Sequence, residues 1–228
     1  MNELTEKKTE IKLVQADALD FLAELPDHSA DCILTDPPYF QGLTHNGARG
    51  NFADLAISRP FWKEFYTQCN RVLKPTGAFY QFTDWRGYAF FYPLAEEFLG
   101  VRNCIIWDKG SGAGNFYTFN HEFILFWTPN TLFRAKQPGA RNVIRLHGFN
   151  AGAARTNGPK LHPTQKPLEL IERLIGDSTD AGALVIDPFS GSGTTALACL
   201  RTGRNFSGCE LQEKYVEIAL HRLKENGL

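Results

Sequence analysis

Short apolar runs alternate along this chain with longer segments in which apolar residues recur at helical spacing. Strands that are separated by helices pair side by side in a parallel sheet, and the helices cover both of its faces. The pattern therefore predicts an α/β fold with a mostly parallel sheet. The expected strands are residues 11–15, 31–35, 77–82, 104–108, 122–127, 183–187 and 205–209, and the expected helices are residues 18–25, 59–73, 86–99, 167–178, 194–201 and 212–224.

The 228 residues, 43% of them hydrophobic, suffice for one globular domain over residues 1–228 and argue against a disordered chain. No apolar run approaches the ~20 residues of a membrane-spanning helix, and the polar start lacks the apolar core of a signal peptide. We therefore expect a cytoplasmic protein without membrane contact. The five cysteines form no C-x-x-C pair, so we expect buried thiols rather than a metal site or disulfides.

Three stretches fit neither period, namely residues 40–58, 110–119 and 129–161. Long irregular segments in a compact domain are usually functional loops, so we expect all three to lie over a site. The turn Lys74-Pro75-Thr76-Gly77 is expected to separate a helix from the following strand, because proline and glycine interrupt regular structure.

One expected strand runs directly into Asp36-Pro37-Pro38-Tyr39, at the sheet edge where open α/β folds bind ligands. An aspartate that caps a proline-rich turn is one interpretation of this sequence. The other is a site for a planar group with an amino function. The Asp36 carboxylate and a proline carbonyl would accept hydrogen bonds from the amino hydrogens, and the Tyr39 ring would stack on the planar group.

A second expected strand ends at Asp187 and continues through a glycine-rich turn, Pro188 to Gly193, into a helix that begins near Thr194. Glycine lets a ligand approach the backbone at such a turn. The turn has neither the P-loop sequence nor the dinucleotide fingerprint, so it suits a nucleoside cofactor that need not carry a phosphate. A tight connection without a ligand is the competing interpretation. Glu210, after the last expected strand, would bind ribose hydroxyls or cap a helix.

Together, these segments resemble the motifs of the amino-group DNA methyltransferases that use S-adenosylmethionine. Asp36-Pro37-Pro38-Tyr39 is similar to their catalytic motif, and the stretch from Asp187 to Thr195 is similar to their main cofactor motif. His162-Pro163-Thr164-Gln165-Lys166-Pro167 resembles a further motif that lines the cofactor pocket. The catalytic motif comes first, which is the order of the β group. The resemblance implies a Rossmann-like, seven-stranded methyltransferase sheet in circularly permuted order.

The resemblance also implies roles for individual residues. Asp36 and the carbonyl of Pro37 or Pro38 would hydrogen-bond the amino group of a flipped base, on which Tyr39 would stack, without a covalent intermediate. Asp17 matches an acid that binds the adenine of the cofactor; its second interpretation is a helix N-cap. The remaining residues implied for binding S-adenosyl-L-methionine are His162, Thr164, Gln165, Lys166, Asp187, Phe189, Ser190, Gly191, Ser192, Gly193, Thr194, Thr195 and Glu210.

The implied activity is site-specific methyl transfer to the exocyclic N6 of adenine in double-stranded DNA. Family members with aspartate at the first position of the catalytic motif mostly act on adenine, and the N4 of cytosine is the second candidate target. A methyltransferase of RNA or protein and a catalytically inactive nucleic-acid-binding protein are the competing functions. A homodimer and a cognate restriction endonuclease are partners that the resemblance leaves open.

The net charge of −1 hides an uneven distribution. Residues 123–166 contain seven basic and no acidic side chains, whereas the rest of the chain carries 17 basic and 25 acidic ones. An acid-free basic interval fits a surface that contacts phosphates, although a solvated face is the ordinary interpretation. The resemblance assigns target recognition to residues 129–161. Residues 40–58, which carry His45, Asn46 and Arg49 among glycines, are a candidate mobile loop that closes on the flipped base.

Overall fold

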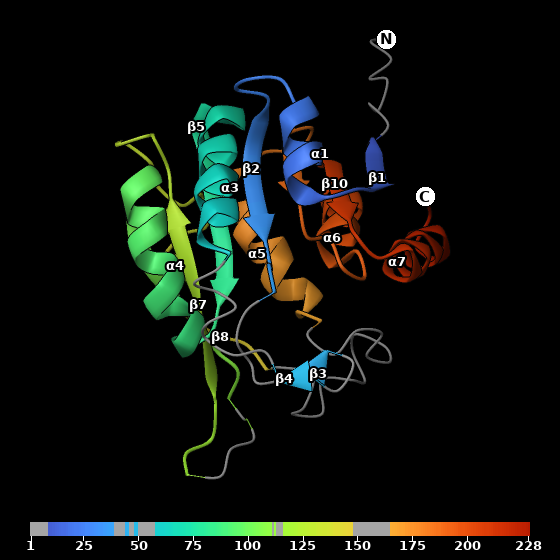
Figure 1. Ribbon diagram of the computed structural model, residues 1–228. Helices are drawn as coiled ribbons and strands as arrows, with labels where there is room; N and C mark the ends of the chain where they lie inside the picture. Colours follow the sequence, from blue (N-terminus) through green and yellow to red (C-terminus); the bar gives the residue numbers. More distant parts are fainter. Residues whose placement is uncertain are drawn as a thin grey trace.

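The computed structural model describes residues 9–38, 44–45, 48–49, 58–110, 112, 116–147 and 165–228. An eight-stranded sheet runs through its centre in the order β1-β10-β9-β2-β5-β7-β6-β8 (Figure 1). Every neighbouring pair in this sheet is parallel except those of β7, which is antiparallel to β5 and β6. The strands are β1 (Ile11–Gln15), β2 (Ala30–Thr35), β5 (Leu73–Thr83), β6 (Asn103–Asp108), β7 (His121–Trp127), β8 (Val143–Arg145), β9 (Leu184–Asp187) and β10 (Asn205–Glu210), and a separate antiparallel pair joins β3 (Thr44–His45) to β4 (Ala48–Arg49).

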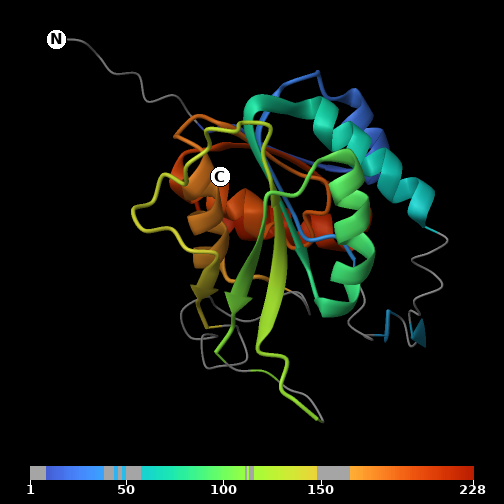
Figure 2. The ribbon, with the colours of Figure 1, turned by 90° about the vertical axis from the view of Figure 1, so that its left-hand side faces the viewer.

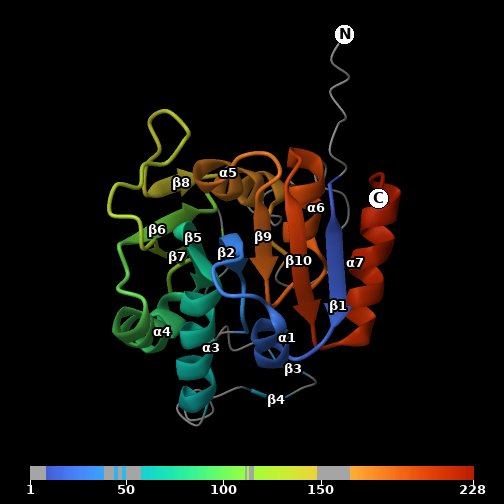
Figure 3. The ribbon, with the colours of Figure 1, turned by 90° about the horizontal axis from the view of Figure 1, so that it is seen from above.

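Helices cover both faces of the sheet, so the molecule has three layers (Figure 3). One face carries α1 (Ala18–Glu24), α3 (Arg59–Val72) and α4 (Trp85–Phe98), whose Phe21, Phe65 and Phe91 belong to one hydrophobic cluster. The other face carries α5 (Leu168–Ser178), α6 (Thr194–Thr202) and α7 (Glu213–Glu225), and Leu174, Leu197 and Leu223 belong to a second cluster. Apolar residues at helical spacing give each helix the buried face that this arrangement requires.

The parallel strands give the sheet two unlike edges. Their carboxyl ends gather on one side, together with the amino end of the antiparallel β7; we call this side the carboxyl edge and the opposite side the amino edge. In Figure 1 the strand arrows of β2 and β5 point down toward the carboxyl edge, and Figure 2 shows the same edge at the bottom of the sheet. Loops at this edge connect strands to the helices that follow them.

The predicted α/β fold is confirmed, and all the predicted helices and strands except β5 match the structure within one residue at each end. The sheet has eight strands rather than seven, because β8 lies inside the stretch 129–161 that showed no period. β5 begins at Leu73, so the predicted turn at residues 74–77 is wrong. The pairing jumps there from Ala30↔Leu73 to Cys32↔Ala78. Pro75, which has no N–H to donate, falls inside this irregularity, where no ladder bond is needed.

The described cysteines are free thiols. Four of them are buried, as predicted, whereas Cys104 is half-buried. Burial raises the pKa of the Cys32 thiol to about 12, so that thiol is inert at neutral pH. Among the described helices, none has the length and apolar character that crossing a membrane requires.

Candidate functional site

The turn between β9 and α6 is fastened by its own polar groups at the carboxyl edge. The Ser190 N–H donates to the Cys209 carbonyl at 2.9 Å, which ties the turn to β10. The Ser190 hydroxyl donates to the Asp187 carbonyl at 3.0 Å, and the Gly193 N–H donates to the Ser190 carbonyl at 2.8 Å. The shape of the turn is therefore fixed by bonds within the protein.

Two glycines of this turn meet different constraints. Gly193 precedes α6 with φ +76°, and a Cβ there would lie 2.7 Å from the Cβ of Ala219 in α7. Gly191 has φ +49°, but nothing lies within 4 Å of the position that its Cβ would take. Gly193 is thus required for packing, whereas Gly191 borders open space from which a ligand can approach the backbone.

Asp187 ends β9 and is only 3% exposed. Its Oδ2 accepts a hydrogen bond from the Thr195 hydroxyl at 2.7 Å, and its Oδ1 accepts one from the Phe189 N–H at 3.0 Å. Burial, with a smaller contribution from the nearby charge of Asp36, raises the pKa of Asp187 to about 7 against the opposing effect of these two bonds. Asp187 therefore joins the strand to the first turn of α6 from inside the protein.

Other residues expected to bind the cofactor also have structural partners. The Phe189 ring packs on Phe65 of α3, with centroids 5.6 Å apart. Buried Arg222 of α7 donates to the Thr194 hydroxyl at 2.9 Å and to the Ser192 carbonyl at 3.3 Å. Phe189, Ser192 and Thr194 therefore hold the shape of the turn through contacts with α3 and α7.

Glu210, the last residue of β10, lies beside the open side of the turn. Its Oε2 accepts a hydrogen bond from the Gly191 N–H at 3.0 Å, and its Oε1 accepts one from the Gln212 N–H at 2.9 Å. Two backbone donors thus orient a half-buried carboxylate whose oxygens have further lone pairs for hydroxyl donors. Together with the open space at Gly191, this arrangement fits the ribose of a nucleoside cofactor.

Asp17 lies just beyond β1, next to β10 in the sheet, where Gln15 pairs with Glu210. Its Oδ1 accepts a hydrogen bond from the Leu19 N–H at 2.8 Å, so Asp17 is the N-cap of α1. The N-cap interpretation is confirmed, and the position places this acid at the same edge as Glu210.

The Asp36 segment follows β2, the neighbour of β9. Ile33 of β2 pairs with Ile186 of β9, so the ends of these two strands lie side by side. Pro37 is buried and Pro38 is exposed directly beyond Asp36. The structure therefore brings together the two strand ends that the sequence singled out, while Tyr39 lies outside the described residues.

A buried lysine bridges Asp36, which follows β2, and a carboxylate of β7, the strand on the other side of β5. Lys166, whose side chain is 5% exposed, donates to the Asp36 Oδ2 at 2.7 Å and lies 3.2 Å from the Glu122 Oε2 of β7. Its ammonium lies 5.1 Å from the ring centroid of Phe82, which belongs to the intervening β5. Burial alone would lower the pKa of Lys166, but Asp36 and Glu122 together raise it above its usual value. Lys109 lies 3.3 Å from the Glu122 Oε1 and continues the row of alternating charges.

The structure describes only the end of the segment before α5 that resembles a cofactor motif. Lys166 contacts the Asp36 side of the site, and Gln165 beside it is buried. His162 and Thr164 lie outside the described residues.

Sequence reasoning missed Glu122, because the run at residues 122–127 has the composition of ordinary core. Leu125 of this strand is indeed buried, but Glu122 is as well, at 7% exposure. The available signal was an acid at the amino end of an apolar run. Its meaning depends on β7 being antiparallel, which brings that end to the carboxyl edge.

The described basic residues of the interval 123–166 do not form one surface. Lys166 is buried in the site, and Arg145 pairs with Asp108 at the carboxyl edge at 2.8 Å. Lys136 lies at the amino edge, where it pairs with Asp180 and where its N–H donates to the Asp177 carbonyl. Residues 128–142 follow the carboxyl end of β7, which is at the amino edge. This part of the interval therefore lies away from Asp36, contrary to the expectation that the whole stretch covers the site.

Comparison with known proteins gives matches over nearly the whole chain. The sequence model of the N6/N4 methyltransferase family, described as DNA methylase, matches residues 30–221. The type II methyltransferase M.HpaI of Haemophilus parainfluenzae is 32% identical over an alignment of 232 positions, which covers 93% of this chain and 74% of that protein. M.BglII of Bacillus subtilis is 28% identical and matches 91% of this chain and 67% of its own length.

Solved structures agree with the sequence matches. The M1.HpyAVI–SAM complex has a TM-score of 0.71 and 27% identity, over 93% of this chain and 98% of that one. The cytosine-N4-specific PvuII DNA methyltransferase is similar in fold, with a TM-score of 0.74 and 19% identity over 97% of this chain and 89% of its own. With its two motif-bearing strand ends side by side at one sheet edge, and with these similarities along its length, the chain belongs to the N6/N4 family of DNA methylases, which use S-adenosyl-L-methionine as methyl donor.

Proposed function

We propose that this protein transfers a methyl group from S-adenosylmethionine to the exocyclic N6 of adenine at a specific sequence in double-stranded DNA. The observation that carries the proposal is the adjacency of Asp36 and the β9–α6 turn at the carboxyl edge. Asp36 is anchored there by Lys166 at 2.7 Å, one strand away from a turn that has open space beside Gly191. A base held at Asp36 would thus face a cofactor held at the turn.

Glu210 and Gly191 form the cofactor half of the site. Bound S-adenosylmethionine supplies a methyl group on a positively charged sulfur, which leaves as a neutral thioether. The oriented Glu210 carboxylate would accept hydrogen bonds from the ribose hydroxyls, and the backbone at Gly191 allows close approach. Asp17 at the neighbouring strand end would accept from the adenine amino group. His162, Thr164 and Gln165 stay predicted contributors to this half.

Asp36 and the proline carbonyls form the catalytic half. An exocyclic amino nitrogen is a poor nucleophile because its lone pair is delocalised into the ring. Asp36 and the carbonyl of Pro37 or Pro38 would accept both amino hydrogens, which orients the lone pair and stabilises the positive charge that develops on nitrogen. As the new N–C bond forms, the carbon–sulfur bond breaks, and the nitrogen loses one proton to solvent afterwards.

The target atom lies inside a duplex, so the base must leave the stack before it reaches Asp36. Tyr39, three residues along the chain, is the predicted stacking partner for the flipped base. Recognition of the sequence around the base is predicted for residues 143–161, the part of the interval 129–161 that begins at β8. β8 pairs with β6 and ends at the carboxyl edge, which supports this placement.

Adenine is proposed over cytosine because aspartate stands first in the Asp36 motif, a tendency of the adenine enzymes. The N4 of cytosine is the second candidate, and the fold similarity to a cytosine-N4-specific enzyme favours keeping it. The relatives are type II methyltransferases by name, which supports a cognate restriction endonuclease as a partner. Modified-base sequencing of DNA from cells that express the protein identifies the base and the recognition sequence together. Light scattering after gel filtration tests whether the protein also forms a homodimer.

Two variants test the two halves of the site against each other. Asp36→Ala should abolish methyl transfer to DNA and leave the affinity for S-adenosylmethionine unchanged. Glu210→Gln should weaken that affinity about tenfold, because an amide can accept from only one of the backbone donors at Gly191 and Gln212. Calorimetric titration measures the affinity, and mass spectrometry of DNA nucleosides measures methyl transfer. Glu213→Gln, at an exposed position in the first turn of α7, is the control. Substantial methyl transfer by the Asp36→Ala variant would contradict the proposal.

A further inference from the structure

We infer that Lys166 is a positioning residue for the catalytic aspartate, and that Glu122 is its second anchor. The inference rests on the proposed function of Asp36. It differs from the sequence resemblance, which places Lys166 among the residues that bind the cofactor. The ammonium of Lys166 lies between two carboxylates, 2.7 Å from the Asp36 Oδ2 and 3.2 Å from the Glu122 Oε2.

The sheet order explains why a lysine is needed here. Asp36 follows β2 and Glu122 begins β7, and β5 lies between these strands. Their carboxylates cannot meet directly across β5 without repelling each other. Lys166 spans this gap above the Phe82 ring of β5, at 5.1 Å from its centroid, and pairs with both carboxylates from a buried position.

The geometry also gives Lys166 a specific effect on Asp36. A charged donor at Oδ2 favours the ionised carboxylate and fixes the plane in which its oxygens lie. An ionised Asp36 accepts hydrogen bonds and does not compete as a donor, which is the state that binding an amino group requires. Glu122 holds Lys166 from the other side, and Lys109 holds Glu122 at 3.3 Å. Among the residues that the structure describes, the charged groups that face Asp36 include Lys166 directly, Glu122 and Lys109 behind it, and Asp187 on β9.

Lys166→Met tests the inference in the full chain. Calorimetry should give an unchanged affinity for S-adenosylmethionine. The kcat for DNA methylation should fall about 100-fold, the loss expected when a catalytic group is misplaced by about 1 Å. The acidic limb of the pH–rate profile should move to higher pH, because the positive charge that favours ionised Asp36 is gone.

Three further variants keep the test decisive. Lys166→Arg should recover part of kcat and return the acidic limb toward its normal position. Glu122→Gln should lower kcat less than Lys166→Met does, because Lys166 still forms its ion pair with Asp36. Lys74→Met is the matched control, since Lys74 donates to both carboxylate oxygens of Asp31 at 2.8 Å, at the other end of β2 and far from the site; its kcat and pH profile should be normal.

The outcomes separate this inference from the proposed function. Weakened cofactor affinity with an unmoved pH profile in Lys166→Met would overturn the inference and return Lys166 to the cofactor pocket. A wild-type protein that methylates no DNA would refute the proposed function instead. If Lys166→Met does not fold, Glu122→Gln and Lys166→Arg decide, because the inference requires both to lower kcat while the affinity for S-adenosylmethionine stays that of the wild type.

A second, independent observation concerns exposed aromatic side chains. In the described part of the chain, the four large aromatic residues that are exposed all lie at the carboxyl edge: Trp85, Phe116, Tyr117 and Phe119. Phe116 and Tyr117 are 98% and 88% exposed and belong to the connection between β6 and β7. The described residues of this hairpin extend below the rest of the sheet in Figure 1. Its root is fixed by the pair Asp108↔His121 and by a 2.7 Å bond from the Lys109 N–H to the Asn120 carbonyl.

We propose that Phe116 and Tyr117 insert into the DNA duplex beside the flipped base, which rests on the proposed function. The hairpin is continuous with the site, because β7 begins at its end and carries Glu122, the anchor of Lys166. Arg145, 80% exposed, lies at the root of the hairpin and offers a cation to the phosphates. An aromatic ring between base steps replaces part of the stacking that is lost when a base leaves the helix.

The double variant Phe116→Ala/Tyr117→Ala tests this contact, with Leu132→Ala as control. Leu132 is 79% exposed but lies beyond the carboxyl end of β7, at the amino edge. On duplexes that carry the recognition sequence with 2-aminopurine at the target, the double variant should show about tenfold weaker binding and a reduced fluorescence increase. A mismatch at the target base lowers the cost of flipping, so it should remove most of the deficit. The proposal would be overturned if the double variant bound paired and mismatched targets with the same loss of affinity, or bound both as wild type does. A wild-type protein that methylates no DNA would instead refute the proposed function.

Discussion

At the residue scale, the burial of Asp187 links the stability of the fold to pH. The pKa of this carboxyl rises from 3.8 to about 7 in the folded state because burial disfavours its charge. The folded protein therefore binds this proton more tightly than the unfolded chain does. The resulting stability is fully present below about pH 4 and is lost as the pH rises through about 7.

Asp187→Asn removes this titration while keeping the size of the side chain. We expect the free energy of unfolding of the wild type to fall, relative to that of the variant, by up to about 1.4 kcal/mol per pH unit between pH 4 and 7. Above pH 7 the difference should be constant. Urea unfolding at pH 5, 6, 7 and 8 measures it, and parallel pH dependences of the two proteins would show that Asp187 is ionised throughout.

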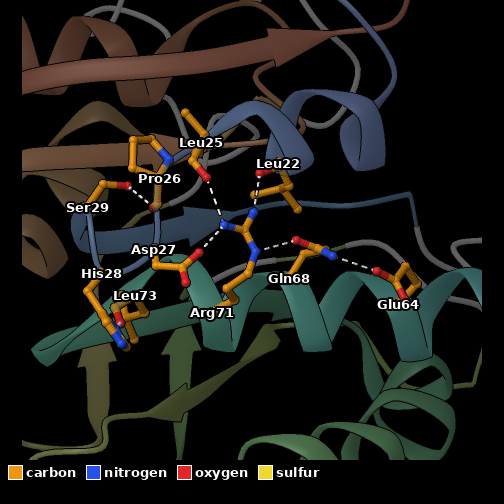
Figure 4. Close-up of polar contacts among 10 residues, drawn as sticks. All are labelled: Leu22, Leu25, Pro26, Asp27, His28, Ser29, Glu64, Gln68, Arg71 and Leu73. Atoms are coloured by element: carbon orange, nitrogen blue, oxygen red, sulfur yellow. Dashed lines mark hydrogen bonds and ion pairs between the residues drawn. The ribbon is translucent and has the colours of Figure 1, made fainter.

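At the scale of elements, Arg71 of α3 caps the carboxyl end of α1, as Figure 4 shows. Its guanidinium donates to the carbonyls of Leu22 and Leu25 at 2.8 Å each, and to the Asp27 carboxylate at 2.6 Å. Its Nε donates to the Gln68 side-chain oxygen at 2.7 Å, which fixes the orientation of the guanidinium. α1 has no basic residue in its own last turn, so a cation from a neighbouring helix satisfies its final carbonyls.

Arg71→Met should lower the free energy of unfolding by about 2 kcal/mol, since carbonyls at a helix end lose charged donors. The kcat for methyl transfer and the affinity for cofactor should not change, because these contacts lie away from the carboxyl edge. Arg201→Met is the control, since Arg201 is 55% exposed and makes a surface pair with Glu172. Equal destabilisation of both variants would show that the closing contact adds nothing specific.

The elements also show what the sequence can and cannot predict. β1 and α5 were recognisable because each carries a full period of apolar residues between clear interruptions. β8 was not, because Val143–Arg145 is too short to show an alternation and exists through its pairing with β6. The strand ends at Asp36 and Asp187 were predicted as sites from local sequence. The contact between Lys166 and Glu122 was not, because it depends on which strands become neighbours on either side of β5.

At the scale of the whole molecule, the order and direction of the strands separate the described basic residues of the interval 123–166 onto two edges of the sheet. β7 runs antiparallel to both of its neighbours, so the chain that leaves it returns at the amino edge. Arg134, Lys136 and Arg141 lie on that return, and Lys136 binds Asp180 beyond α5 there. Their charges therefore lie on the side opposite Asp36, although the sequence groups them with Arg145 and Lys166.

This division predicts which basic residues meet DNA. The triple variant Arg134→Gln/Lys136→Gln/Arg141→Gln should bind duplex DNA as wild type does, and its affinity should fall with salt at the same slope. Arg145→Gln, at the carboxyl edge, should lower the slope by about one, the loss of one phosphate contact. Fluorescence anisotropy at four salt concentrations measures both slopes. A slope reduced by about three in the triple variant would mean that DNA, or a second protomer that carries it, reaches the amino edge.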